Sequence, residues 1–313
     1  MPKLDNLLVY QWQAWDGYLI SHLVADYCRI DACYDDDEHV FDGHISPNIR
    51  AVLMQINLSR STHFPAQRAQ IVARLRARGV RVFNQNPSDI RKTHLYRCLN
   101  RAGLPSAKAM RDGPEDEWLF VKSDLNWGGG PERRLPPDLP QAPRAALGDS
   151  LQSRHISRWD AYRKLRRCKI PDAYWSDPNT VIERYIANAD ACFYRVYGFG
   201  EALVFVQAHN RALIQKVANA PQDRNHYLHA RKLTSPSLPI PAELAHTVRL
   251  FRQRIAPTYF CIDVLYDDQG FVIVDLNLTP YAGHAPQHAR AAEFLRMGAD
   301  GLLSASIPAG DSP

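Results

Sequence analysis

The sequence predicts an α/β fold in which a parallel sheet at the start of the chain is followed by lobes rich in antiparallel strands. Short apolar runs at 7–10, 51–56 and 80–83 are typical of strands, and helical patterns separate them. Strands that alternate with helices form a parallel sheet covered on both faces. From residue 180 onwards, apolar runs follow one another through short polar turns, which indicates hairpins.

The bulk composition is that of a folded protein. The chain has 313 residues, 45% hydrophobic and 23% charged, which allows two or three lobes. Lys and Arg exceed Asp and Glu by 38 − 33 = 5, which suits phosphorylated ligands and is too small to indicate nucleic acid. Six cysteines lack zinc or redox spacing, no signal peptide is visible, and no apolar run reaches the roughly 20 residues that span a bilayer. We therefore expect a soluble cytoplasmic protein with reduced cysteines.

Four helices are expected. Residues 16–25 have apolar residues at helical spacing with Asp16 as N-cap, and residues 66–78 form a basic amphipathic pattern that stops at a glycine. Two further helical patterns cover 92–102 and 241–255. We interpret the arginines of the second helix as a solvated face in preference to a nucleic-acid patch.

The rest of the chain is expected to be rich in strands and loops. The predicted strands are 118–122, 181–183, 192–199, 202–208, 260–266 and 271–276, of which the last four form two hairpins. A proline-rich stretch at 131–143 predicts a surface excursion. The basic segment at 153–169 is expected to be helical in part.

The last predicted hairpin carries three oxygen-bearing side chains that can converge. Asp263 lies on its first strand, and Asp275 and Asn277 lie two residues apart on its second. Side chains two residues apart share one face of a strand, and pairing through the turn can bring Asp263 beside them. Two carboxylates and an amide oxygen are a hard donor set suited to Mg²⁺. A solvated strand with three outward polar residues stays open as the alternative.

A glycine-rich loop follows the strand that ends at Lys122. Gly128, Gly129 and Gly130 allow backbone N–H groups to approach a phosphate, and Lys122 can reach a phosphate oxygen. On this loop alone, a plain flexible turn is the favoured interpretation.

A third motif is an apolar strand that ends at Glu183 and is followed by Asp190. Exposed backbone groups at such a strand end can bind an adenine edge, and a nearby acid can bind ribose hydroxyls. Taken alone, an ordinary strand with an ion-paired glutamate is favoured.

In this order the motifs resemble those of the ATP-grasp superfamily, over residues from about 84 to about 284. The resemblance rests on the segments Asn86 to Lys92, Gly103-Leu104-Pro105, Phe120-Val121-Lys122 with the three glycines, Val181-Ile182-Glu183 followed by Asp190, Ile262-Asp263, and Val274 to Asn277 followed by Pro280. It implies an ATP-grasp fold with a Rossmann-like N-terminal domain at 1–86, a central lobe with the glycine-rich loop at 87–180 and a C-terminal lobe with the metal site at 181–313.

The resemblance also implies a role for each matched residue. The ATP-binding residues would be Lys92, Lys122, Gly128, Gly129, Gly130, Glu183, Tyr185, Ile186 and Asp190. The lysines and glycines would contact the phosphates, Glu183 and the backbone after it the adenine, and Asp190 the ribose. Two Mg²⁺ ions would bind at Asp263, Asp275 and Asn277. The chain departs from the family at Asp275, where a glutamate is usual, and in the long proline-rich excursion.

Within the superfamily the chain is most similar to the glutathione synthetase and ribosomal-protein glutamate ligase type. That likeness implies Arg195, Arg211 and Asn277 as catalytic residues. The two arginines, with Arg224 and Asn225 beyond them, would neutralise the transferred phosphate. Independently, basic groups before the metal hairpin can stabilise an acyl-phosphate. The implied function is an ATP- and Mg²⁺-dependent carboxylate–amine or peptide ligase acting through an acyl-phosphate. A phosphotransferase acting on a hydroxyl, or a non-catalytic nucleotide-binding module, stays open.

The carboxylate and amine substrates, small molecules or peptides, are expected between the N-terminal sheet and the metal hairpin. Trp12 and Trp15 would either form a wall of that crevice or pack under the sheet, and Tyr281, Gly283 and His284 would border the acceptor. The glycine-rich loop is expected to be a mobile cover. We expect no membrane or nucleic-acid partner and leave a homodimer open.

Overall fold

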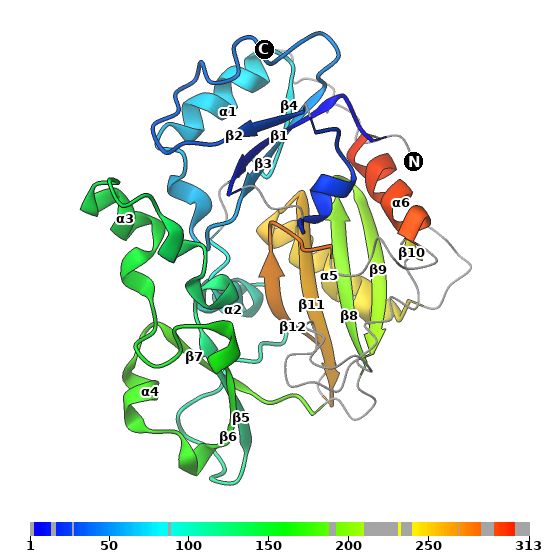
Figure 1. The fold of residues 1–313 in the computed structure, drawn as a ribbon. Coiled ribbons are helices and arrows are strands. Elements are labelled where there is room, and N and C mark those ends of the chain that lie inside the picture. The colour runs from blue at the N-terminus through cyan, green and yellow to red at the C-terminus, as the bar shows by residue number, and fades with distance from the viewer. Residues whose placement is uncertain are drawn as a thin grey trace.

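The computed structural model of the chain contains three β-sheets with helices packed around them (Figure 1). It describes residues 3–13, 17–26, 28–86, 89–187, 192–209, 231–232, 240–268, 270–282 and 291–303. Within these ranges, the helices are all too short or too polar to cross a membrane.

The first sheet is parallel, as predicted. Its order is β2-β1-β3-β4, with β1 (Leu7–Trp12), β2 (Arg29–Asp31), β3 (Ala51–Ile56) and β4 (Arg81–Phe83). Every residue of β1 and β3 is buried, because both faces of these central strands are covered. The predicted basic helix is α1 (Arg68–Ala77), and it leads into β4.

The prediction of a helix at 16–25 is wrong for residues 17–25, the part that the structure describes. Only one 3₁₀ turn, η1 (Leu19–His22), forms there. Besides the local bonds of this turn, the backbone of the segment pairs with a distant one, since Leu19 N donates to Pro280 O at 2.8 Å and Ala282 N donates to Gly17 O at 2.8 Å. A long-range contact therefore overrides the local helical pattern.

The second sheet is antiparallel and has the order β6-β5-β7. Its strands are β5 (Trp118–Ser123), β6 (Arg163–Arg166) and β7 (Thr180–Arg184). The segment 153–169, expected to be helical in part, contains strand β6, preceded and followed by the 3₁₀ turns η6 (Trp159–Ala161) and η7 (Arg167–Lys169). Leu165 faces the core, whereas Lys164 and Arg166 lie over the ring of Trp118. This alternation of sides is the strand period.

The excursion between β5 and β6 is a series of short helices. These are η3 (Asn126–Gly129), η4 (Glu132–Arg134), α3 (Gln141–Leu147) and η5 (Asp149–Leu151), and α4 (Asp172–Ser176) follows β6. Because β7 pairs with β5, the boundary expected after residue 180 falls inside a strand of the second sheet.

The third sheet is antiparallel, with the order β10-β9-β8-β11-β12. Its strands are β8 (Cys192–Phe199), β9 (Ala202–His209), β10 (Arg231–Lys232), β11 (Tyr259–Asp267) and β12 (Gly270–Asn277). One face packs against α5 (Ala242–Ile255) and α2 (Lys92–Arg101), which share a core with it. Both predicted hairpins and both predicted helices are therefore confirmed.

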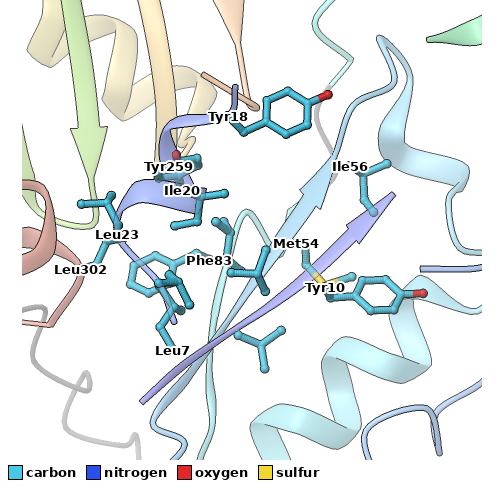
Figure 2. Packing of buried hydrophobic residues seen from close by; sticks show 14 of the residues in the cluster. Leu7, Tyr10, Tyr18, Ile20, Leu23, Met54, Ile56, Phe83, Tyr259 and Leu302 are labelled. Carbon is cyan, nitrogen blue, oxygen red and sulfur yellow. The ribbon is translucent and has the colours of Figure 1, made fainter. Parts of the chain in front are cut away.

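The other face of the third sheet packs against the N-terminal domain and α6 (Ala291–Leu303). Figure 2 shows Tyr259 of β11 in one cluster with Ile20 and Phe83, which lie at the N-terminal domain. The first and third sheets therefore share a hydrophobic core.

A single asparagine ties β4 to the start of β11. Asn84 is buried, and its Nδ2 donates to Tyr259 O at 2.8 Å. Its Oδ1 accepts from the backbone N–H groups of Thr258 and Tyr259 at 3.1 and 3.0 Å. The backbone φ of Asn84 is 52°, a left-handed conformation that asparagine tolerates better than most residues.

Candidate nucleotide and metal site

Lys122 and Glu183 form a buried ion pair between neighbouring strands. Lys122 Nζ lies 2.6 Å from Glu183 Oε1, and the two side chains are only 6% and 4% exposed. Antiparallel pairing of β5 with β7 places both on one face of the second sheet. The hydroxyl of Tyr96, on α2, also donates to Glu183 Oε1. The two charges are thus compensated inside the protein, as buried charges must be.

A β-bulge connects this ion pair to the metal hairpin. The pairing of β11 with β12 passes from Asp263–Asp275 to Val264–Ile273, so that Val274 has no opposite residue. Val274 O accepts from Lys122 Nζ at 3.0 Å and from Tyr96 OH at 3.5 Å. The bulge therefore supplies the acceptor through which Lys122 bridges the second and third sheets.

The two predicted metal carboxylates lie side by side, because the bulge shifts the register of the hairpin by one residue. Asp263 is directly opposite Asp275 in the register, and each residue is 8% exposed. Arg195 of β8 donates from Nε to Asp263 Oδ1 at 2.9 Å, and Lys92 Nζ lies 3.9 Å from Asp275 Oδ1. One cation thus lies next to each carboxylate and reduces their mutual repulsion.

Asn277 is placed at the end of the same hairpin but is engaged with a neighbour. Its Oδ1 accepts from Thr279 N at 2.8 Å and lies 3.1 Å from Thr279 Oγ1. No cluster of three His, Cys, Asp or Glu side chains suited to a metal occurs in the described part of the chain. Mg²⁺ is commonly held by one or two carboxylates together with substrate phosphates. Asp263 and Asp275 fit that pattern, whereas Asn277 would first have to exchange Thr279 for the ion.

The glycine-rich loop is packed against the excursion that follows it. Trp127, Gly128 and Gly129 are consecutive residues with positive φ. A Cβ added to Gly128 would lie 2.5 Å from Trp159 N, so the glycine is required by a close approach of two backbones. Arg133 donates to Gly128 O at 2.7 Å. These contacts pack the loop against the excursion, and its opening in the absence of nucleotide stays a prediction.

The base of the loop touches α2. Lys92, the first residue of α2, donates from Nζ to Leu125 O at 3.0 Å and is 3% exposed. Because Lys92 also approaches Asp275, it lies between the loop and the metal hairpin. Both predicted phosphate lysines therefore lie at the end of β12, Lys122 at Val274 and Lys92 at Asp275.

The remaining predicted residues have mixed outcomes. Tyr185 N donates to Trp118 O at 2.9 Å, which leaves this N–H unavailable to adenine, and the Tyr185 ring lies 3.7 Å from Lys164 Nζ. Ile186 is buried in a small apolar cluster. Seven predicted positions lie outside the described residues, namely Trp15, Asp190, Arg211, Arg224, Asn225, Gly283 and His284. Trp12 packs under the sheet against Phe64, at a ring distance of 5.3 Å, so it is not a wall of the crevice.

Three residues that the sequence analysis missed complete the site. Tyr96 could have been found, since it lies four residues after Lys92 on one helix face. Thr279 lies two residues after Asn277, and its Oγ1 is 3.1 Å from Asn57 Oδ1. Asn57 Nδ2 in turn donates to the hydroxyl of Tyr18. No local signal points to Asn57, because its partners come from opposite ends of the chain.

Comparison with solved structures identifies the fold. The structure titled ATP-grasp ligase PsnB complexed with minimal precursor is similar over 96% of this chain and 99% of its own, with a TM-score of 0.52 and 13% identity. D-alanine–D-alanine ligase from Bacillus anthracis is similar over 96% of this chain and 97% of its own, with a TM-score of 0.47 and 11% identity. A RimK domain ATP-grasp protein from Sphaerobacter thermophilus is similar over 82% of this chain and 81% of its own, with a TM-score of 0.41 and 15% identity. No protein-family model and no curated protein matches the chain.

Proposed function

Since the chain has the ATP-grasp fold, we propose that it is an ATP- and Mg²⁺-dependent ligase that joins a carboxylate to an amine. The observation that carries the proposal is the convergence of Lys92 and Lys122 on the hairpin that bears Asp263 and Asp275. Two cations next to two carboxylates at the end of one hairpin match the charge pattern of a metal-bound polyphosphate.

Each group would have a separate part in nucleotide binding. Lys92 and Lys122 would move from their present carboxylate and carbonyl partners to the phosphate oxygens. Asp263 and Asp275 would hold Mg²⁺, which when bound neutralises phosphate charge. Glu183, on the strand that leads to Tyr185, would lie on the adenine side of the site.

The chemistry needs positioning and charge neutralisation, with no side-chain nucleophile. The substrate carboxylate attacks the γ-phosphorus of ATP, ADP leaves, and an acyl-phosphate forms. The amine then attacks the acyl carbon, and inorganic phosphate leaves with the bonding electrons while the amine loses a proton. Arg195, whose Nε donates to Asp263 Oδ1 at 2.9 Å, would stabilise the phosphate charge when Asp263 holds Mg²⁺.

Hydroxylamine trapping tests the proposal. The purified protein is incubated with ATP, MgCl₂, hydroxylamine and a panel of amino acids and short peptides, and acyl-hydroxamates are identified by mass together with ADP. A ligase gives a hydroxamate and ADP in equal amounts. ADP with a phosphorylated hydroxyl compound would instead indicate a phosphotransferase, and nucleotide binding without ADP formation a binding module.

A further inference from the structure

Arg134 is an exposed cation beside the glycine-rich loop. It is the last residue of η4, and its Cζ lies 6.0 Å from the centroid of the Trp127 ring. Among the residues that the structure describes, its guanidinium has no carboxylate partner and donates no hydrogen bond. The neighbouring Arg133 differs, because it donates to Gly128 O and Ser157 O at 2.7 Å each. Arg133 therefore holds the loop, whereas Arg134 is available to a ligand.

Arg134 also lies next to the N-terminal domain. Gln13 Nε2 donates to Arg134 O at 3.5 Å, just after the end of β1. Burial raises the pKa of Tyr18 to about 12, and the positive charge of Arg134 opposes that shift. Both observations place Arg134 where the loop meets the carboxyl end of the first sheet.

A line of hydrogen-bonded side chains leads from this place to the metal hairpin. The hydroxyl of Tyr18 accepts from Asn57, whose Oδ1 lies 3.1 Å from Thr279 Oγ1. Thr279 is in turn bonded to Asn277 at the end of β12. A substrate whose carboxylate is activated at the hairpin can therefore extend along this line towards Arg134.

The same end of the first sheet carries further uncharged polar side chains. Gln11 of β1 and Gln55 of β3 are opposite each other in the register, and both are buried. The side-chain amide of Gln55 has no hydrogen-bond partner among the described residues. Buried amides without partners are unusual, and this one leaves polar atoms at the same end of the sheet as Arg134.

We propose that Arg134 binds a second carboxylate of the substrate, so that the preferred substrate is a dicarboxylic acid or a peptide with an acidic side chain. This rests on the proposed ligase function. A guanidinium matches a carboxylate with two parallel hydrogen bonds, and the Trp127 ring gives Arg134 a cation–π contact on one side. Arg134 is a specificity-determining residue here, because it contacts the end of the substrate that does not react.

Matched acid and amide substrates test the assignment. The pairs are L-glutamate with L-glutamine, L-aspartate with L-asparagine, and Ala-Glu-Ala with Ala-Gln-Ala, in the hydroxylamine assay with ATP and MgCl₂. The wild-type protein should prefer the acid of at least one pair by about 10- to 100-fold in kcat/KM, the size of one charge-assisted interaction. Arg134→Gln should remove this preference mainly through KM, and Arg134→Lys should retain part of it.

A binding measurement separates recognition from turnover. The preferred acid should raise the melting temperature of the nucleotide-free wild-type protein more than its amide does, and Arg134→Gln should abolish the difference. Arg158→Gln is the matched control, since Arg158 lies on the same excursion but pairs with Asp160 at 2.9 Å. Equal use of acid and amide in every pair, or a preference that survives in Arg134→Gln, overturns the role assigned to Arg134 and leaves the ligase proposal standing. Absence of any hydroxamate overturns the ligase proposal and the assignment with it.

Discussion

Lys122 Nζ lies 2.6 Å from Glu183 Oε1, and the same amine donates to Val274 O at 3.0 Å. One buried lysine therefore joins a strand of the second sheet to a bulge in the third. Lys122 and Glu183 are both predicted ATP-binding residues, so contacts of the proposed nucleotide site also hold two lobes together. Substitutions here should change stability as well as nucleotide affinity.

Replacing Lys122 with methionine should destabilise the protein by about 3–5 kcal/mol, because it leaves Glu183 buried without its cation. The double variant Lys122→Met with Glu183→Gln should recover much of this loss, since a glutamine side chain on β7 would be neutral and could still accept from Tyr96. Urea unfolding of the nucleotide-free proteins gives the free energies. ATP affinity should be lost in both variants.

The exposed Lys108 provides the control for the Lys122 and Glu183 variants. Lys108→Met should change the free energy of unfolding by no more than about 0.5 kcal/mol, as is usual for surface positions. If Lys122→Met is as mild as Lys108→Met, the ion pair does not contribute to the stability of the fold. If ATP affinity is unchanged in Lys122→Met, the predicted phosphate contact is wrong.

The sequence was sufficient to predict the hairpin that carries the two carboxylates, but not its exact register. Asp263 and Asp275 lie on facing strands joined by a short Asp- and Gly-rich turn, which fixes the pairing within one or two residues. The bulge at Val274 was not predictable, because it depends on donors from β5 and α2 that are more than 150 residues away in sequence. The predicted convergence of Asp263 and Asp275 is observed, but it depends on this bulge, since a regular hairpin would place Val274 opposite Asp263.

The failures have one physical cause. Residues 16–25 contain a helical pattern, but the described backbone there pairs with the segment after Asn277. Asn57 likewise acquires its role only through Tyr18 and Thr279, which are 39 and 222 residues away. Contacts of this range leave no periodic signal in the local sequence.

Substitutions at Asp275 test the magnesium site. Asp275→Asn removes one negative charge from the carboxylate pair and should abolish hydroxamate formation while the protein stays folded. The Mg²⁺ concentration for half-maximal ATP binding should rise at least tenfold. Asp275→Glu restores the residue usual in ATP-grasp proteins and should retain activity.

Asp268, in the turn of the same hairpin, is the control for this test. It is exposed and far from the carboxylate pair along the strands, so Asp268→Asn should leave the Mg²⁺ dependence of ATP binding unchanged. An identical Mg²⁺ dependence in Asp275→Asn and the wild-type protein would show that the ion binds elsewhere.

Asn84 should be one of the most sensitive positions for stability. Alanine there would remove the hydrogen bonds of Asn84 to the N–H groups of Thr258 and Tyr259 and to the carbonyl of Tyr259. A residue with a Cβ atom, asparagine less than others, is also strained at a φ of 52°. We expect Asn84→Ala to lower the free energy of unfolding by about 2–4 kcal/mol. Asn84→Gly, which relieves only the strain, should be less harmful than alanine. If the two variants are equally stable, backbone strain has no part in the effect.

Glu132 should make stability depend on pH. Its side chain is fully buried, Oε1 accepts from Ser59 N at 2.7 Å, and Oε2 has no hydrogen-bond partner among the described residues. Burial raises the pKa of Glu132 above its ordinary value of 4.5, against the opposing effects of Ser59 and Lys92. The folded protein thus holds this proton at pH values where the unfolded chain has released it.

The sign of the pH effect follows from this difference in proton binding. Stability from Glu132 is fully present below the ordinary carboxyl pKa and is lost as the pH rises towards the raised pKa, at up to about 1.4 kcal/mol per pH unit. Glu132→Gln keeps the acceptor for Ser59 and cannot ionise, so its advantage over the wild-type protein should grow with pH across that interval and then level off. Urea unfolding of both proteins between pH 4 and 8 measures the difference, and a difference independent of pH would show that Glu132 titrates normally.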